Sequence, residues 1–215
     1  STDKTVQLAR AFGAKVYQET AWDGFGPQKN KAMQYANGDW ILSIDADERI
    51  TPKLAKEIIE QIKIHSEVEG ILVPRLSSYC GKFLKHGGWW PDYVLRLCRK
   101  GQGVFSDDLV HEKLLVSGAT IKLKNHIIHY SFENFEQVLG KIDKYSSLGA
   151  RQLVLRGKTY GLGAALLHAL STFLRTYLLK AGFLDGQYGL MLAISNAEGT
   201  YYKYLKVMLL QKPDK

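Results

Sequence analysis

Helical and extended patterns of apolar residues alternate through the first 76 residues of the chain. Helix signals cover residues 3–12, residues 28–35 and the segment that starts at Thr51-Pro52, with a capping residue, a glycine stop or an early proline at their ends. Apolar runs at residues 14–18, 40–44 and 70–76 predict strands. The second of these runs is typical of a strand that is buried on both faces. Strands that alternate with helices favour an α/β domain with a mostly parallel sheet.

The pattern changes in the middle of the chain and again near its end. Residues 77–130 contain short β-like runs and turns, including the cluster Gly87-Gly88-Trp89-Trp90-Pro91, and the last third is helical. We therefore predict two parts: a catalytic α/β domain over residues 1–135 and a helical extension over residues 136–215.

Composition and cysteine content narrow the class of protein. Hydrophobic residues make up 46% of the chain and charged residues 23%, as in a folded protein rather than a disordered one. The two cysteines, Cys80 and Cys98, are too few for a disulfide framework and lack the spacing of a zinc finger. They fit a reducing compartment.

The net charge of +8 is concentrated near the carboxyl terminus. Nine Lys and Arg against three Asp and Glu follow residue 150, so six of the eight net positive charges lie in the last third. Such a segment suits an anionic partner, either membrane phospholipid or nucleic acid, although a merely solvated basic face has the same composition. No helix-turn-helix or RNA-binding signature accompanies the charge, so we expect no nucleic acid partner.

Apolar residues recur at helical spacing from Leu162 onward. Arg175 and Lys180 interrupt them, and we expect no apolar run long enough to span a bilayer. An amphipathic helix that lies in the interface, with its basic residues toward anionic headgroups, fits this pattern. The alternative is a helix that packs on the catalytic domain.

Two carboxylates end the predicted strand 40–44. In open α/β sheets ligands bind at this edge, and residues i and i+2 of a strand point the same way, so Asp45 and Asp47 are expected to face one site. A divalent cation on the phosphates of a nucleotide relieves their repulsion. The alternatives are a helix cap, a solvated turn, or a phosphatase of the haloacid-dehalogenase type, which Arg49 disfavours.

The order of several short blocks resembles the inverting family 2 glycosyltransferases. The blocks are Ser1-Thr2-Asp3-Lys4-Thr5, Gly13-Ala14-Lys15-Val16, Gln28-Lys29-Asn30, Asn37-Gly38-Asp39-Trp40, Asp45-Ala46-Asp47-Glu48, Gly88-Trp89-Trp90-Pro91-Asp92, Arg96-Leu97-Cys98-Arg99, Val110-His111-Glu112 and His129-Tyr130-Ser131. The resemblance is strongest to the lipopolysaccharide inner-core glucosyltransferases of Gram-negative bacteria. It implies a GT-A, Rossmann-like, nucleotide-sugar-binding domain. Family members have two strands and a base-binding Asp before the first block, so we expect the first strands to be missing.

The resemblance also implies roles for the residues that bind the donor. Asp45 would contact the ribose or the metal, and Asp47 would ligate Mg²⁺ or Mn²⁺ on the donor diphosphate. Lys29 would contact the diphosphate or the base, unless it is an exposed helix lysine. His129 would complete the metal shell, since neutral imidazole suits Mn²⁺, unless it is a structural histidine at a strand end.

The catalytic base and the acceptor site are expected in the middle of the chain. An inverting transferase needs a carboxylate that takes the proton from the acceptor hydroxyl. Glu112 fits the family position best, Asp108 is the second candidate, and Asp107 is a turn residue that could also serve. His111 would orient the carboxylate or simply pack. Trp89 and Trp90 would stack on the acceptor or donor sugar, or pack in a core or loop.

We therefore expect an inverting, metal-dependent hexosyltransferase that moves glucose from UDP-glucose onto a lipopolysaccharide core or another lipid-linked saccharide. Two alternatives retain the fold: a transferase for another nucleotide sugar and a non-catalytic module of the membrane surface. A nucleotide-sugar hydrolase or pyrophosphorylase is a third. The expected location is cytoplasmic, peripheral on the inner face of the plasma (inner) membrane.

Overall fold

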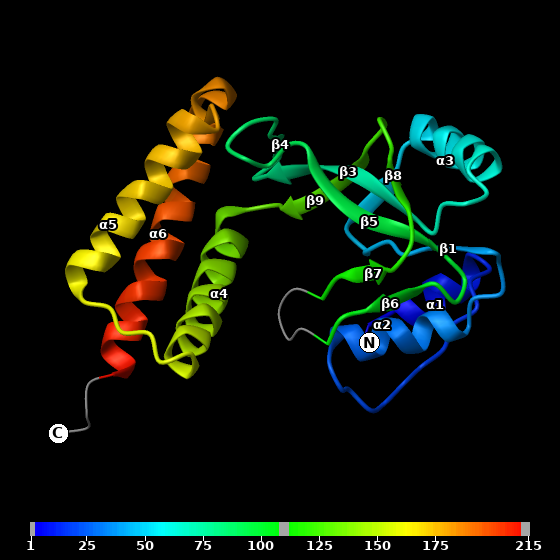
Figure 1. The fold of residues 1–215 in the computed structure, drawn as a ribbon, viewed down its shortest axis with the longest axis horizontal. Helices are drawn as coiled ribbons and strands as arrows, with labels where there is room; N and C mark the ends of the chain where they lie inside the picture. Colours follow the sequence, from blue (N-terminus) through cyan, green and yellow to red (C-terminus); the bar gives the residue numbers. More distant parts are fainter. Residues whose placement is uncertain (1–2, 108–111, 212–215) are drawn as a thin grey trace. The chain divides into compact units, whose positions relative to one another are not determined.

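The computed structural model describes residues 3–107 and 112–211, and its elements confirm the α/β class with a C-terminal helical extension (Figure 1). The helices of the first third are α1 (Thr5–Ala11), α2 (Phe25–Gln34) and α3 (Pro52–Ile64). Those of the last third are α4 (Phe135–Leu155), α5 (Leu162–Leu174), the π-helical η1 (Arg175–Leu179), the 3₁₀ helix η2 (Gly182–Asp185) and α6 (Gly186–Leu210).

Seven strands form one sheet with the order β1-β5-β3-β9-β2, while β4 and β8 pair with β3 beside this path. Their bounds are β1 (Trp40–Leu42), β2 (Glu48–Ile50), β3 (Gly70–Tyr79), β4 (Lys82–Phe83), β5 (Asp92–Arg99), β8 (Thr120–Lys122) and β9 (Ile127–Phe132). A second sheet pairs β6 (Gly103–Phe105) with β7 (Leu114–Val116).

The expectation of a mostly parallel sheet is wrong for the strand pairs whose register the structure describes. Among these pairs β3–β9 is parallel, whereas β1–β5, β2–β9, β3–β4 and β6–β7 are antiparallel. The reason is that β5 and β9, from the middle of the chain, take places beside strands of the first third.

Strand β1 differs from the prediction in its burial. It lies at one end of the strand order, and Leu42 is 38% exposed, so it is not a strand buried on both faces. Residues 14–18, predicted as a strand, have no regular structure. The predicted helix start at Thr51 is confirmed: its side chain accepts a hydrogen bond from the Leu54 amide, and Leu54 and Ile58 are buried.

Contacts divide the described residues into two units. One comprises residues up to 43, residues 66–72 and residues 95–121; the other comprises residues 44–65, 73–94 and those from 122 onward. The proposed boundary near residue 135 stays a prediction. The first unit has a core of Cys98, Phe105 and Leu114. The Asn30 side chain joins α2 to β6 through two hydrogen bonds with the Phe105 backbone, of 2.8 and 3.0 Å.

The second unit joins α3 and several strands to the C-terminal helices. Its core includes Tyr79, Leu84, Val138 and Leu192, and α6 packs on both α4 and α5. The Gly87-Gly88 turn permits a close approach to these helices. Both glycines have positive φ, and a Cβ on Gly88 would lie 2.5 Å from the Lys180 ammonium.

Helix α5 continues directly into η1, which corrects the expectation about bilayer-spanning length. Residues Leu162–Leu179 form a stretch of 18 residues with a mean hydropathy of 1.3, long and apolar enough to cross a membrane by length and composition alone. Only 11% of it is buried. Arg175 does not break the helix, because the chain passes through it in a π-helical turn.

Candidate active site

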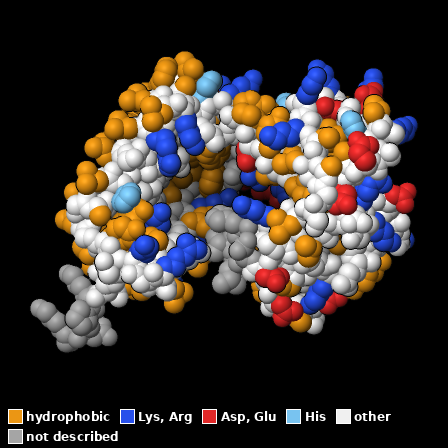
Figure 2. Space-filling view, in the orientation of Figure 1, with side chains coloured by type: hydrophobic (Ala, Val, Ile, Leu, Met, Phe, Trp, Pro, Cys, Tyr) orange, Lys and Arg blue, Asp and Glu red, His pale blue; other side chains and the backbone are white. Residues whose placement is uncertain are grey.

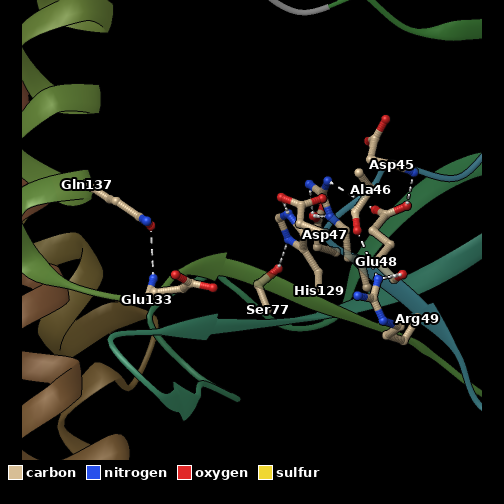
Figure 3. Close-up of polar contacts among 11 residues, drawn as sticks. Asp45, Ala46, Asp47, Glu48, Arg49, Ser77, His129, Glu133 and Gln137 are labelled. Atoms are coloured by element: carbon tan, nitrogen blue, oxygen red, sulfur yellow. Dashed lines mark hydrogen bonds and ion pairs between the residues drawn. The ribbon is translucent and has the colours of Figure 1, made fainter. Parts of the chain in front are cut away.

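The carboxylates of residues 45–48 lie on a tight turn, not at the end of a straight strand. Strand β1 ends at Leu42, and the Glu48 amide donates a 3.0 Å hydrogen bond to the Asp45 carbonyl as the chain enters β2. The alternation assumed for a strand therefore does not apply. Figure 3 shows the Asp45 side chain directed away from that of Asp47.

A buried carboxylate holds this turn in place. The Glu48 side chain is fully buried, and its Oε2 accepts a 3.1 Å hydrogen bond from the Asp45 amide. Its Oε1 lies 3.8 Å from Arg75 Nη1, and the Arg75 guanidinium also donates two hydrogen bonds, of 2.7 and 3.0 Å, to Asp92 Oδ2. Buried charges are tolerated when they are paired and hydrogen-bonded in this way.

Replacement of Glu48 by alanine is expected to lower the free energy of unfolding by about 3 kcal/mol, because the turn loses its anchor and Arg75 loses one of two carboxylates. Urea denaturation measures this. Glu60→Ala is the matched control, since its side chain is 54% exposed and its ion pair with Lys56 joins neighbouring turns of α3; it should change stability by less than about 0.5 kcal/mol. Equal effects of the two substitutions would contradict the anchoring role.

The Asp47 carboxylate meets His129 from strand β9. Asp47 Oδ2 lies 3.3 Å from His129 Nε2, and the two side chains point toward one another (Figure 3). On the other side of the ring, His129 Nδ1 lies 2.8 Å from Ser77 Oγ. Strand pairing explains the encounter, because His129 is opposite both Ser77 on β3 and Glu48 on β2.

The environment of His129 favours the neutral imidazole. Burial lowers the pKa of His129, the Arg75 guanidinium lowers it further, and the Asp47 carboxylate opposes them. In the tautomer whose Nδ1–H donates to Ser77 Oγ, the Nε2 atom that faces Asp47 keeps its lone pair for a cation.

Asp47 and His129 fit a divalent cation as two adjacent ligands. Adjacent ligands of an octahedral Mg²⁺ or Mn²⁺ lie about 3 Å apart, close to the separation observed between Oδ2 and Nε2. Among the described residues no group of three or more His, Cys, Asp or Glu gathers into a metal site. Asp47 and His129 would therefore be the protein ligands of such a cation, and Mg²⁺ is commonly bound through few protein groups.

Lys29 and Glu112 form a second pair, within the first unit. Lys29 Nζ lies 3.0 Å from Glu112 Oε1 and 5.3 Å from the centre of the Phe105 ring. Both side chains are largely shielded from solvent. The close approach of α2 requires Gly26, because a Cβ there would lie 2.1 Å from the Ser106 carbonyl oxygen.

The remaining candidates for the catalytic base and for contacts with the acceptor do not share one location. Asp107 is exposed, and Asp108 and His111 lie outside the described residues. Trp89 is half-buried, 5.7 Å from the Tyr79 ring and 6.1 Å from the Phe132 ring. Trp90, also half-buried, meets His126 edge-on.

Sequence reasoning missed three residues that organise the Asp47 site. They are Arg75, Ser77 and Asp92, and it gave Glu48 no anchoring role. One signal was available: Arg75 is a charged residue inside the apolar run of β3, a position that requires a buried partner. Nothing local marks Ser77, and Asp92 was named only as the end of the block Gly88-Trp89-Trp90-Pro91-Asp92, without a role.

Comparison with known proteins identifies the family. A model described as glycosyl transferase family 2 matches residues 1–107. An uncharacterized glycosyltransferase of Rickettsia typhi is 27% identical over 218 residues, which cover 96% of this chain and 74% of the relative. The lipopolysaccharide core biosynthesis glycosyltransferase LpsC of Rhizobium meliloti is 27% identical over 222 residues, which cover 95% of this chain and 80% of the relative. On the basis of the match over residues 1–107, the chain belongs to glycosyl transferase family 2.

Proposed function

We propose that this glycosyltransferase moves a hexose from a nucleotide sugar to a saccharide acceptor, with inversion at the anomeric carbon and with Mg²⁺ or Mn²⁺. The observation that carries the proposal is the Asp47–His129 pair at 3.3 Å, in a family 2 chain, with Ser77 fixing the ring. A carboxylate and a neutral imidazole on adjacent strands form a ligand pair for a cation on a diphosphate.

Each residue has one task in the proposed reaction. Asp47 and His129 would hold the cation, which when bound would supply positive charge to stabilise the departing nucleoside diphosphate. Lys29 adds a positive charge for the diphosphate or a contact to the base. Glu112 takes the proton of the acceptor hydroxyl. The oxygen of that hydroxyl attacks the anomeric carbon, and the bond between this carbon and the diphosphate breaks. Asp108 is the second candidate for this base, and Asp45 would contact the ribose or the metal.

For the donor and acceptor we propose UDP-glucose and a lipopolysaccharide core or another lipid-linked saccharide. The name of the Rhizobium meliloti relative, a lipopolysaccharide core biosynthesis glycosyltransferase, supports the class of acceptor. A small change in the shape of the donor site would select another nucleotide sugar instead.

Incubation of the protein with radiolabelled nucleotide sugars and an acceptor tests the proposal. The acceptor is either intact lipopolysaccharide core or the oligosaccharide obtained from it by removal of the lipid. The measurement is made on residues 1–215 and on the same chain extended by any residues that its gene encodes before Ser1. Metal-dependent transfer from UDP-glucose is expected. Release of free sugar or sugar phosphate without acceptor would point to a hydrolase or pyrophosphorylase, and no turnover of any donor by either form would favour a non-catalytic membrane-surface module.

We also propose that the C-terminal helices attach the protein to the inner face of the plasma (inner) membrane. Large apolar side chains of α5 and η1 are exposed, including Leu167 at 70% and Leu179 at 82%. Figure 2 shows apolar side chains together with lysine and arginine over the C-terminal helices. Apolar side chains suit the acyl boundary, and Arg175 and Lys180 suit anionic headgroups.

Vesicle flotation is expected to show stronger binding to phosphatidylglycerol-containing vesicles than to pure phosphatidylcholine, and weaker binding at high salt. The double substitution Leu167→Ser and Leu179→Ser should weaken binding at least about 10-fold, because two leucines leave the interface. Ile64→Ser is the control, since Ile64 is 66% exposed on α3. Equal binding of the double variant and the control would contradict membrane attachment through this surface.

A further inference from the structure

A cavity of about 320 Å³ that is open to solvent lies in the second unit, between the ends of strands β3 and β9 and helices α4 and α6. Tyr79 and Phe132 contribute from the strands, Trp89 from the loop after β4, Lys141 from α4, and Lys203 from α6. The volume is at the lower end of the usual range for ligand sites, about 300–1,000 Å³.

The walls of this cavity combine aromatic rings with hydroxyl and amide groups. Tyr79, Trp89 and Phe132 form a contiguous aromatic wall, with ring centres between 5.7 and 6.1 Å apart. Polar side chains come from Ser195, Asn196 and Thr200 on one face of α6, with Ser146 opposite on α4. Flat apolar faces beside hydrogen-bonding groups suit a sugar ring, which has both kinds of surface.

The charge of the cavity has one sign. Lys141 and Lys203 line it, and its lining contains no Asp or Glu. Lys141 Nζ lies 4.4 Å from the centre of the Phe132 ring, and burial lowers the pKa of Lys203. In the described part of the chain neither ammonium forms an ion pair. An anionic group would supply the missing counter-charge.

The cavity adjoins the Asp47–His129 pair along the same two strands. Ser77 and Tyr79 are two residues apart on β3, so they point to one face of the sheet, about 7 Å apart along the strand. On β9, His129 pairs with Ser77 and Phe132 pairs with Tyr79. His129 and Phe132 are three residues apart, and a shift of register accommodates the additional residue of β9. Ser77 therefore contacts His129 on the same face on which Tyr79 contacts Phe132.

A ligand seated on Trp89 and Phe132 would therefore lie near the proposed metal pair, because Phe132 follows His129 by three residues on β9.

We propose that this cavity binds an acidic sugar unit of the acceptor, one that carries a phosphate or a carboxylate next to the hydroxyl-bearing unit that is glycosylated. The inference rests on the proposed function and specifies its acceptor. The aromatic wall takes the ring, Asn196 and Thr200 take its hydroxyls, and Lys141 and Lys203 take the anion, while the Ser195 hydroxyl stays bonded to that of Tyr79.

Gly199 offers a position from which a larger side chain can fill the cavity. Gly199 lines it, and an added Cβ would lie 3.9 Å from Ile142, an ordinary contact. Gly199→Leu therefore places a side chain in the cavity while strengthening helix α6. Gly140→Leu is the matched control, because Gly140 is helical, has open space around it and does not line the cavity.

Nuclear magnetic resonance titration with glucose 6-phosphate, glucuronate and methyl glucoside tests the site. The two anionic sugars should bind at least 10-fold more tightly than the neutral one, to the wild-type chain and to Gly140→Leu alike. Gly199→Leu should lose this binding at least 10-fold with an unchanged or higher Tm. Equal affinity for all three sugars, or unaltered binding by a folded Gly199→Leu, would overturn the proposal; preference for only one of the two anions identifies phosphate or carboxylate as the group bound.

The lysines give an independent test. Lys203→Gln should reduce the preference for anionic over neutral sugar at least 10-fold, whereas Lys144→Gln, an equal loss of charge on α4 outside the cavity, should not. Binding of UDP-glucose is measured on the same samples. Intact donor binding with no anionic preference would refute the cavity site alone, and anionic-sugar binding without any donor binding would refute the proposed function alone.

Discussion

Asp47→Ala is expected to lower the rate of sugar transfer by at least about 100-fold, because the cation that stabilises the leaving diphosphate loses its carboxylate ligand. The loss should appear as a much higher requirement for Mn²⁺ as well as a lower kcat, since His129 alone holds the ion weakly. Transfer assays across a range of Mn²⁺ concentrations measure both effects.

Asp143→Ala is a suitable control for this substitution. Its side chain is 82% exposed and pairs with Lys206 on the helical extension, so transfer and metal requirement should stay as in the wild type. A wild-type rate and an unchanged Mn²⁺ requirement in Asp47→Ala would show that Asp47 does not hold the metal.

Glu112→Gln is expected to lower kcat by about 10²- to 10⁴-fold, because an amide cannot accept the proton of the acceptor hydroxyl. Glutamine keeps the shape of the side chain and a hydrogen-bond acceptor for Lys29, which lies 3.0 Å from Glu112. Donor affinity should therefore change little. Transfer rates and calorimetric donor affinity, measured on one preparation, separate the two effects.

Asp108→Asn provides the comparison for the base. If Glu112 is the base, Asp108→Asn should retain most of the transfer activity. The opposite result, a large loss in Asp108→Asn and a small one in Glu112→Gln, would assign the proton transfer to Asp108.

Local sequence patterns predicted helices better than they predicted the sheet. Thr51 and Pro52 mark the start of α3 within the segment itself, and the apolar spacing after Leu162 shows a helix without reference to the rest of the fold. Strand order depends on partners far along the chain. The run 40–44 therefore looked buried on both faces, although β1 lies at the end of the strand order and pairs there with β5.

The same distinction applies to the candidate site. Resemblance to a family assigned Asp47 and His129 to one metal, but the 3.3 Å approach of their side chains depends on the antiparallel pairing of β2 with β9. The geometry assumed for Asp45 and Asp47 was wrong because a strand was extended through a turn. Glu48 received no anchoring role because its burial and its bond to the Asp45 amide exist only in the folded chain.

In the proposed reaction Asp47 and His129 hold a metal that binds the diphosphate of a nucleotide sugar. Isothermal titration calorimetry of UDP-glucose with and without Mn²⁺, on the wild-type protein and on Asp47→Ala, is the direct test of this metal site. We predict binding that requires Mn²⁺ and disappears in the variant, while binding of a different nucleotide sugar with the same dependence would keep the mechanism and change the sugar. Binding that is equal with and without Mn²⁺, or equal in the variant and the wild type, would contradict the claim.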